Sequence, residues 1–100
     1  MIDTHALDAV YIRSDEVVAR EVEGQLIIVP LTAGVGDGQD ELYSLNDTGK
    51  EIWDRLDGIR SLRTIAGELA REYSAPVGDI ERDVIGLVSE LSRRRMLMVK

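Results

Sequence analysis

The chain has 100 residues, 44% of them hydrophobic and 31% charged, a composition typical of one small globular domain. Its net charge of −7 disfavours sequence-independent binding to nucleic acid or to an anionic membrane, because both draw on Lys and Arg side chains. Without cysteine, the chain has no disulfides or thiolate metal sites. No apolar run approaches the about 18 residues of a membrane span, and the N-terminus does not resemble a signal peptide. We therefore expect a cytoplasmic protein with a single domain over residues 1–100.

Two strand-like runs follow an N-terminal segment of little periodicity. For residues 1–16, a flexible segment and an edge strand around Tyr11 both remain open. Residues 17–22 and 26–31 are rich in β-branched residues, and the connection between them contains Gly24, which predicts a hairpin. Because the second run is apolar on both faces, we expect it to form a central strand that helices cover on one side.

A glycine-rich stretch separates the hairpin from a third strand. Residues 30–40 contain three glycines and two aspartates without periodicity, which predicts a surface loop. A gate or a contact for a partner enzyme is one interpretation of this loop, and a tolerated insertion is the simpler one. Residues 41–45 then predict a short strand in which Tyr43 and Leu45 share one face.

The segment 45–58, LNDTGKEIWDRLDG, joins the strand-rich half of the chain to a helical half. Its apolar residues recur at helical spacing, and Asn46 is placed to cap the N-terminus of that helix. Gly58 is suited to the left-handed conformation that ends a helix. Trp53 lies on the apolar face, and as the largest side chain of a mainly aliphatic core it should be buried by all three helices.

Two more amphipathic helices follow. Ser61 predicts the N-cap of the first, and the segment 74–78 interrupts it, because a proline excludes the helical conformation from the preceding residue. Asp79 predicts the N-cap of the second, which runs to about Arg94, and residues 96–99 leave room for a last short strand. The buried stripe of this last helix should consist of Ile80, Val84, Leu87, Val88 and Leu91.

Together these elements predict an α+β, winged-helix-like domain: a small antiparallel three-stranded sheet followed by three helices that cover one of its faces. The order of LNDTGKEIWDRLDG, IRSLRTIAGELAREY and DIERDVIGLVSELSRRRML resembles the PqqD-like family of peptide-binding domains, also called RiPP recognition elements. The resemblance covers residues 17–97. The chain departs from the family at the loop 30–40, which is longer than usual, and at Arg95, where many members have glycine.

The resemblance implies a function. Members hold the leader segment of a precursor peptide while a partner enzyme, such as a radical-SAM protein, a cyclase or a protease, modifies the attached core. It does not say which precursor or which modification is involved. A winged-helix interaction or regulatory domain without a role in peptide modification is the alternative.

Catalysis and DNA binding find little support in the sequence. The single histidine, His5, lies near the N-terminus, no serine has a base placed beside it by pattern, and GVGDG lacks the lysine of a phosphate-binding loop. We therefore expect no catalytic residue, cofactor or metal. The helix that would enter a DNA groove is acidic, which is the wrong sign. The basic run 93–95 can dock an anion, but stabilisation of a helix C-terminus is the simpler interpretation.

Peptide capture requires an unpaired strand edge beside an apolar groove. We expect a leader to add as an antiparallel strand along residues 42–45, with side chains of the last helix completing the groove. The predicted peptide-binding residues are Leu42, Tyr43, Ser44, Leu45, Glu81, Asp83, Val84, Ile85 and Val88. The flank of the helix that carries Ile85 is favoured as the groove wall. The alternative is the opposite flank, where Asp83 would meet a leader lysine or arginine.

Overall fold

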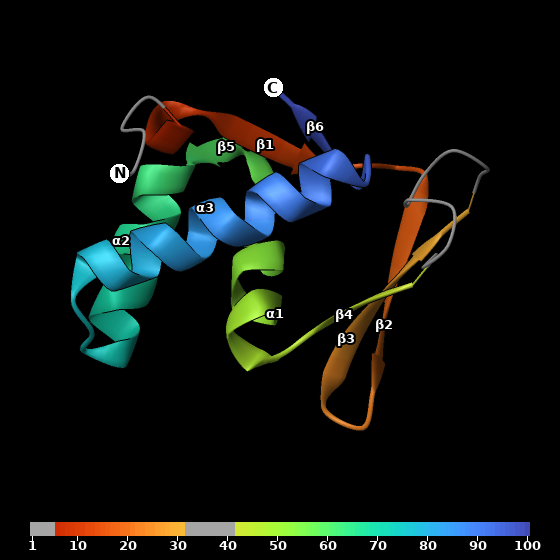
Figure 1. The fold of residues 1–100 in the computed structure, drawn as a ribbon, viewed down its shortest axis with the longest axis horizontal. Helices are drawn as coiled ribbons and strands as arrows, with labels where there is room; N and C mark the ends of the chain where they lie inside the picture. The colour runs from red at the N-terminus through yellow and green to blue at the C-terminus, as the bar shows by residue number, and fades with distance from the viewer. Residues whose placement is uncertain (1–5, 32–41) are drawn as a thin grey trace.

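The computed structural model describes residues 6–31 and 42–100, which form three helices and two antiparallel sheets of three strands each (Figure 1). The elements in chain order are a 3₁₀ turn at Ala6–Asp8, β1 (Val10–Arg13), β2 (Val17–Val22), β3 (Gln25–Pro30), β4 (Tyr43–Leu45), α1 (Asp47–Asp54), β5 (Asp57–Ser61), α2 (Leu62–Tyr73), α3 (Val77–Arg93) and β6 (Leu97–Val99). An α+β domain with small antiparallel sheets and three helices is thus confirmed. His5 and most of the predicted loop lie outside the described residues.

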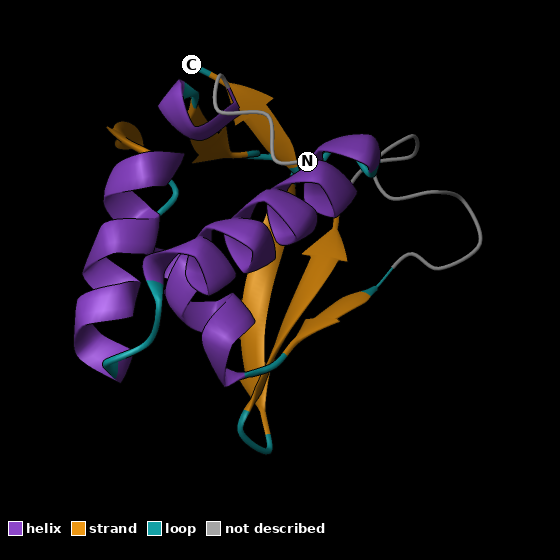
Figure 2. Ribbon diagram, turned by 60° about the vertical axis from the view of Figure 1, so that its left-hand side comes forward, coloured by secondary structure: helices purple, strands orange, loops and turns teal. Residues whose placement is uncertain are grey.

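The predicted hairpin is confirmed as β2 and β3. Val22 pairs with Gln25, and the two residues between them, Glu23 and Gly24, both have positive φ angles, of 52° and 83°. Two such residues form the tight turn that matches the twist of paired strands. β3 is the central strand of the β2-β3-β4 sheet, as its two apolar faces predict. Figure 2 shows the three helices on one side of this sheet.

The second sheet, with strand order β5-β1-β6, is missing from the predicted fold, which contains one sheet only. Residues 10–13 do not form an edge strand, because β1 lies in the centre and pairs with β5 on one side and β6 on the other. The short last strand, which the sequence analysis gives as one possibility for residues 96–99, is present as β6. These strands are short and pair with segments far away in the chain, so no local pattern indicates them.

The first helix is shorter than predicted. Asn46 caps α1 as expected, since its Oδ1 accepts a hydrogen bond from the Gly49 amide at 2.9 Å. The helix ends at Arg55, however, and Gly58 lies within β5. Its φ of +80° is used there to bring β5 close to β1, where an added Cβ would lie 3.2 Å from Cδ1 of Ile12. The expectation that Gly58 ends the helix is therefore wrong.

Ser61 and Asp79 were both predicted as N-caps, and only Ser61 is one. Its hydroxyl accepts a hydrogen bond from the Thr64 amide at 3.2 Å at the start of α2. α3 instead begins at Val77, after Pro76, without a side-chain cap. Asp79 lies in the first turn of α3, where its charge interacts favourably with the helix dipole.

The end of α3 is closed by a Schellman motif. The Met96 amide donates to the Leu91 carbonyl at 2.9 Å, and the Arg95 amide donates to the Ser92 carbonyl at 3.0 Å. This geometry requires a left-handed residue, and Arg95 has φ +60°. The glycine that many family members carry at this position therefore has a conformational reason, and this chain places an arginine there.

One hydrophobic core joins the helices to both sheets. Trp53 is 3% exposed, which confirms its predicted burial, and it shares the core with Ile28 of β3 and Leu97 of β6. Arg55 adds a polar connection at the end of α1. Its guanidinium bonds Glu51 of the same helix and also Glu68 and Glu72 of α2. α1 is therefore held to its neighbours both by apolar packing and by a shared cation.

Replacing Trp53 with alanine should lower the free energy of unfolding by about 3–5 kcal/mol, because it leaves a large cavity in the core. Chemical denaturation followed by circular dichroism measures the loss. Tyr73→Ala is the control, since Tyr73 is 43% exposed and its truncation should cost much less. Tryptophan emission typical of water in the native protein would contradict the burial of Trp53.

Replacing Arg95 with glycine should raise the free energy of unfolding by about 0.5–1 kcal/mol. A left-handed conformation costs an L-residue about 1–2 kcal/mol, and the greater unfolded-state entropy of glycine offsets about 0.5–1 kcal/mol of the gain. Arg93→Gly, within the last helical turn, is the matched control and should destabilise by about 1 kcal/mol. If the two variants shift the denaturation midpoint in the same direction, the left-handed geometry of Arg95 is not limiting.

Candidate functional site

β4 presents an open edge. It pairs with β3 on one side, and no strand among residues 6–31 and 42–100 pairs with its other side. The Leu31 amide donates to the carbonyl of Glu16, directly opposite in the β2-β3 ladder, at 2.7 Å. Because bonded directions alternate along an antiparallel strand, Tyr43 and Leu45 direct their backbone groups toward β3. The N–H and C=O of Ser44 therefore point away from the sheet.

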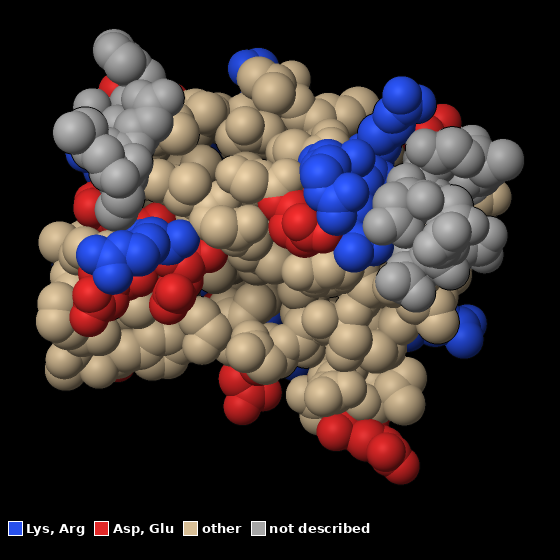
Figure 3. All heavy atoms as spheres, in the orientation of Figure 1, with Lys and Arg blue, Asp and Glu red and all other residues tan. Residues whose placement is uncertain are grey.

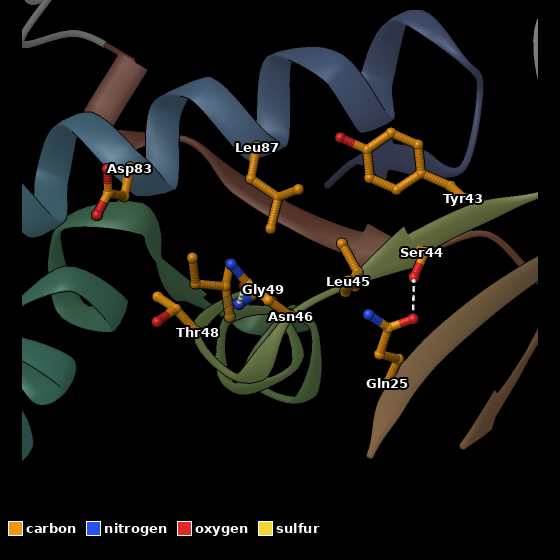
Figure 4. A pocket seen from close by; sticks show the side chains of 10 residues that line it. Gln25, Tyr43, Ser44, Leu45, Asn46, Thr48, Gly49, Asp83 and Leu87 are labelled. Atoms are coloured by element: carbon orange, nitrogen blue, oxygen red, sulfur yellow. Dashed lines mark hydrogen bonds between the residues drawn. The ribbon is translucent and has the colours of Figure 1, made fainter. Parts of the chain in front are cut away.

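A groove of about 490 Å³ lies beside this edge, and we call it the β4–α3 groove. β4 and α3 form its walls, and the first turns of α1 form its floor (Figure 4). The lining residues are Gln25, Tyr43, Ser44, Leu45, Asn46, Thr48, Gly49, Ile52, Asp83 and Leu87. The groove thus combines polar and apolar side chains with backbone groups of Ser44 that lack a strand partner among the described residues, and an extended peptide can use both.

The floor depends on close contact between β4 and α1. An added Cβ on Gly49 would lie 3.1 Å from Cβ of Leu45, which is tighter than ordinary contact. Leu45 and Ile52 are only 3% and 1% exposed, so they anchor the floor in the core. On the open side, the Ser44 hydroxyl donates to Oε1 of Gln25 at 3.2 Å, as Figure 4 shows. A glycine at position 49 therefore lets β4 and α1 approach this closely.

The helical wall is built from Asp83 and Leu87, one turn apart on α3 (Figure 4). Leu87 is half-buried and packs against the core, so it presents part of an apolar surface to the groove. Asp83 is exposed, and none of the described residues forms an ion pair or hydrogen bond with its carboxylate. The wall therefore offers one apolar contact and one uncompensated negative charge.

An aromatic and a cation close the other end of the groove. The Arg94 guanidinium carbon lies 4.8 Å from the centroid of the Tyr43 ring, and its Nε donates to Glu90 at 2.9 Å. Hydrogen bonds from Arg93 and then Arg94 hold the pKa of Glu90 below its usual range, which keeps its carboxylate charged. Figure 3 shows basic side chains gathered over the end of α3 with acidic ones beside them. Within the basic run, Arg93 and Arg94 thus make side-chain contacts inside the fold, to Glu90 and Tyr43.

The structure separates the predicted binding residues into three groups. Tyr43, Ser44, Leu45 and Asp83 line the groove. Leu42, just before β4, is 57% exposed. The remaining four do not line the groove: Val84 and Val88 are buried in the core, and Glu81 and Ile85 lie on the other flank of α3.

The groove lies on the Asp83 flank of α3, opposite the flank that the sequence favoured. Ile85 is half-buried and packs against the core. Leu87 was assigned to the buried stripe, and a helical wheel places it at the edge of the stripe next to Asp83. The other lining residues that the sequence did not indicate are Gln25, Asn46, Thr48, Gly49 and Ile52. Asn46 and Gly49 carry a local signal, but only for the helix start.

Comparison with protein families identifies the family of this chain. The family model of coenzyme PQQ synthesis protein D (PqqD) matches residues 30–97. The chain belongs to the PqqD family. A PqqA binding protein of Xanthomonas oryzae pv. oryzae is 41% identical over 58 residues, which are 58% of this chain and 63% of the relative. The chain thus spans less than two thirds of the length of the curated relatives it matches.

Solved structures share the fold of this PqqD family member. A lasso peptide synthetase B1 complexed with the leader peptide is 26% identical, with a TM-score of 0.73, and the match covers 88% of this chain and 96% of that one. The PqqD truncation of Methylobacterium extorquens PqqCD, described as a stand-alone RiPP recognition element, is 20% identical with a TM-score of 0.71. That match covers 93% of this chain and 92% of the other. The arrangement of helices and small sheets is therefore that of the family.

Proposed function

We propose that this chain is a noncatalytic adaptor that binds the leader segment of a ribosomally made precursor peptide by strand addition and presents it to a separate modifying enzyme. The observation that carries the proposal is the open edge of β4 beside the β4–α3 groove. Two relatives support it, one named a PqqA binding protein and the other a lasso peptide synthetase B1 complexed with a leader peptide.

In this proposal, the leader extends the β2-β3-β4 sheet as an antiparallel strand. Its backbone bonds the outward N–H and C=O of Ser44, and alternate side chains enter the groove against Leu87 and Tyr43. Each backbone bond contributes about 1 kcal/mol net, and each buried apolar anchor contributes about 1.5–3 kcal/mol. Two or three anchors then offset the cost of ordering the peptide and give an affinity around micromolar.

Asp83 gives the leader a preferred charge. Its carboxylate lies on the groove wall without a cation among the described residues, so a leader lysine or arginine opposite it gains a charge-assisted hydrogen bond. At the other end, Arg94 is already held by Glu90 and Tyr43. We therefore expect the Asp83 end of the groove to select for a basic residue.

A separate enzyme, such as a radical-SAM protein, a cyclase or a protease, would carry out the modification. The relatives support this division of labour because they are described as a binding protein and a recognition element. The alternative is a winged-helix interaction or regulatory domain without a role in peptide modification. Its DNA-binding form is disfavoured by the acidic side chains of α3, which would face phosphates. A salt-dependent mobility shift with random duplex DNA would support that alternative.

Amide hydrogen exchange tests the strand addition residue by residue. With a synthetic PqqA peptide as the probe at saturating concentration, exchange at Ser44 should slow, because its N–H gains an acceptor. The amides of Tyr43 and Leu45 are the internal controls, since they already face β3 and should change less. A leader from a lasso peptide precursor is the second probe. If a bound peptide leaves exchange at Ser44 unchanged, strand addition at β4 is ruled out.

Substitutions on the two flanks of α3 test which side lines the groove. Leu87→Ala and Asp83→Asn should each weaken binding of the same peptide about fivefold or more, through a lost apolar contact and a lost charge. Ile85→Ala is the matched control and should change the affinity less than about twofold. Isothermal titration calorimetry measures the affinities, and circular dichroism confirms that each variant is folded. The reverse pattern would place the peptide on the Ile85 flank.

A further inference from the structure

One flank of α3 carries a charge gradient along the β4–α3 groove. Residues spaced three or four apart lie on the same side of a helix, and on this flank they are Asp79, Asp83, Leu87, Glu90 and Arg94. The flank therefore begins with two carboxylates, continues with an apolar side chain and ends in the basic run. Figure 4 shows Asp83, Leu87 and Tyr43 in this order along the groove.

The acidic end of this flank keeps its charge. Asp83 has no ion pair or hydrogen bond for its carboxylate among residues 6–31 and 42–100. Arg82 lies 4.0 Å from Asp79, but the two side chains are 71% and 65% exposed, and such pairs contribute little. Among the described residues that line the groove, only Asp83 is charged, so the wall formed by β4 adds no charge of its own.

The other end of the flank is basic. The three arginines at 93–95 share this end with Glu90, which bonds the first two of them, so these four residues together carry a net charge of +2. Arg94 lies over the ring of Tyr43, which lines the groove, at 4.8 Å. Figure 3 shows the basic side chains gathered over this end of α3. The groove thus has a negative end and a positive end.

Arg95 is the cation of this run that the described part of the fold does not use. It is exposed, and its guanidinium forms no ion pair or hydrogen bond with residues 6–31 and 42–100. Its backbone has φ +60°, a conformation that is less favourable for arginine than for glycine. Unfavourable backbone conformations cluster at functional sites. The position of Arg95 at the end of the groove therefore suits an anionic group of a ligand.

We propose that the groove selects leaders by the order of their charges: first a basic residue at Asp83, then an apolar residue against Leu87, and then an acidic residue at Arg95. The proposal rests on the proposed strand addition at β4. It adds the direction of the ligand and its charge pattern, and it makes Arg95 a specificity-determining residue.

The direction of β4 sets the order. β4 starts at Tyr43, beside Arg94, and runs toward Leu45 and the start of α1. An antiparallel leader therefore has its N-terminal side at the acidic end of the groove and its C-terminal side at the basic end. A basic residue that precedes an acidic one meets opposite charges at both ends, and the reverse order meets like charges at both.

The geometry of α3 sets the spacing. With a rise of about 1.5 Å per residue, Leu87 lies about 6 Å along the helix axis from Asp83, and the last helical residue, Arg93, lies about 15 Å from it. An extended peptide advances about 3.3 Å per residue. We therefore expect the apolar residue about two positions after the basic one, and the acidic residue about four to six positions after it.

Variants of a synthetic PqqA peptide test the charge order. Each variant carries one lysine and one glutamate about four to six residues apart, placed at successive positions and in both orders. At low salt, the tightest lysine-first peptide should bind about tenfold more tightly than the tightest glutamate-first peptide, because two ion pairs replace two like-charge contacts. Isothermal titration calorimetry measures the affinities, and slowed amide exchange at Ser44 confirms binding at β4.

Substitutions in the protein assign the preference to the two ends of the groove. Arg95→Gln and Asp83→Asn should each reduce it to about threefold, since each removes one charge. The double variant D83K/R95E keeps the net charge of the chain and should reduce the preference to less than about twofold. Arg71→Gln, which removes an exposed arginine of α2, is the matched control and should leave the preference at about tenfold.

The outcomes separate this proposal from the proposed function. Equal affinities for the two orders, with Ser44 protected in both complexes, would overturn the charge order while strand addition stands. A preference for glutamate-first peptides, or a lysine-first preference that Arg95→Gln does not reduce, would overturn it as well. If no peptide slows exchange at Ser44, strand addition fails and the charge order fails with it. Circular dichroism of each variant separates a loss of binding from a loss of folding.

Discussion

Burial of one face of α1 is the constraint on which the rest of this structure depends. Ile52 and Trp53 of α1, and Leu56 just after the helix, are at most 3% exposed, and they belong to the one core cluster that includes residues of both sheets and of α2 and α3. In a chain with four aromatic residues, this face supplies much of the large apolar surface that can be removed from water. Arg55 secures the end of the helix by bonding Glu68 and Glu72 of α2. This helix of eight residues contacts β3 and β4 directly and shares the core with Leu97 of the other sheet.

The groove is a consequence of this packing. α1 follows β4 with Asn46 as its cap, so burying α1 fixes the position of the strand before it. Leu45 anchors β4 from below, and this orientation turns the backbone of Ser44 outward. α3 crosses above because its stripe, with Val84 and Leu91 fully buried, packs on the same core. The distance between β4 and α3 is therefore set by core packing.

β4 is an open edge of the β2-β3-β4 sheet within the described residues, and it lies beside the β4–α3 groove. β4 is three residues long and lies beside a groove with a free carboxylate at Asp83, which favours a short peptide with side-chain anchors.

Local signals in the sequence determine those features that depend on contacts between residues close together in the chain. The caps at Asn46 and Ser61, the hairpin turn at Glu23 and Gly24, and the burial of Trp53 follow from side-chain chemistry and periodicity within a few residues. The tertiary structure decided the rest. β1, β5 and β6 pair across most of the chain length, and Gly58 became part of that sheet instead of a helix end because β1 approaches it. The sequence also did not determine which flank of α3 faces β4. A helical wheel identifies the buried stripe of the helix, but it does not say which element of the fold lies beside each edge of that stripe. Only packing placed Asp83 at the groove and Ile85 against the core.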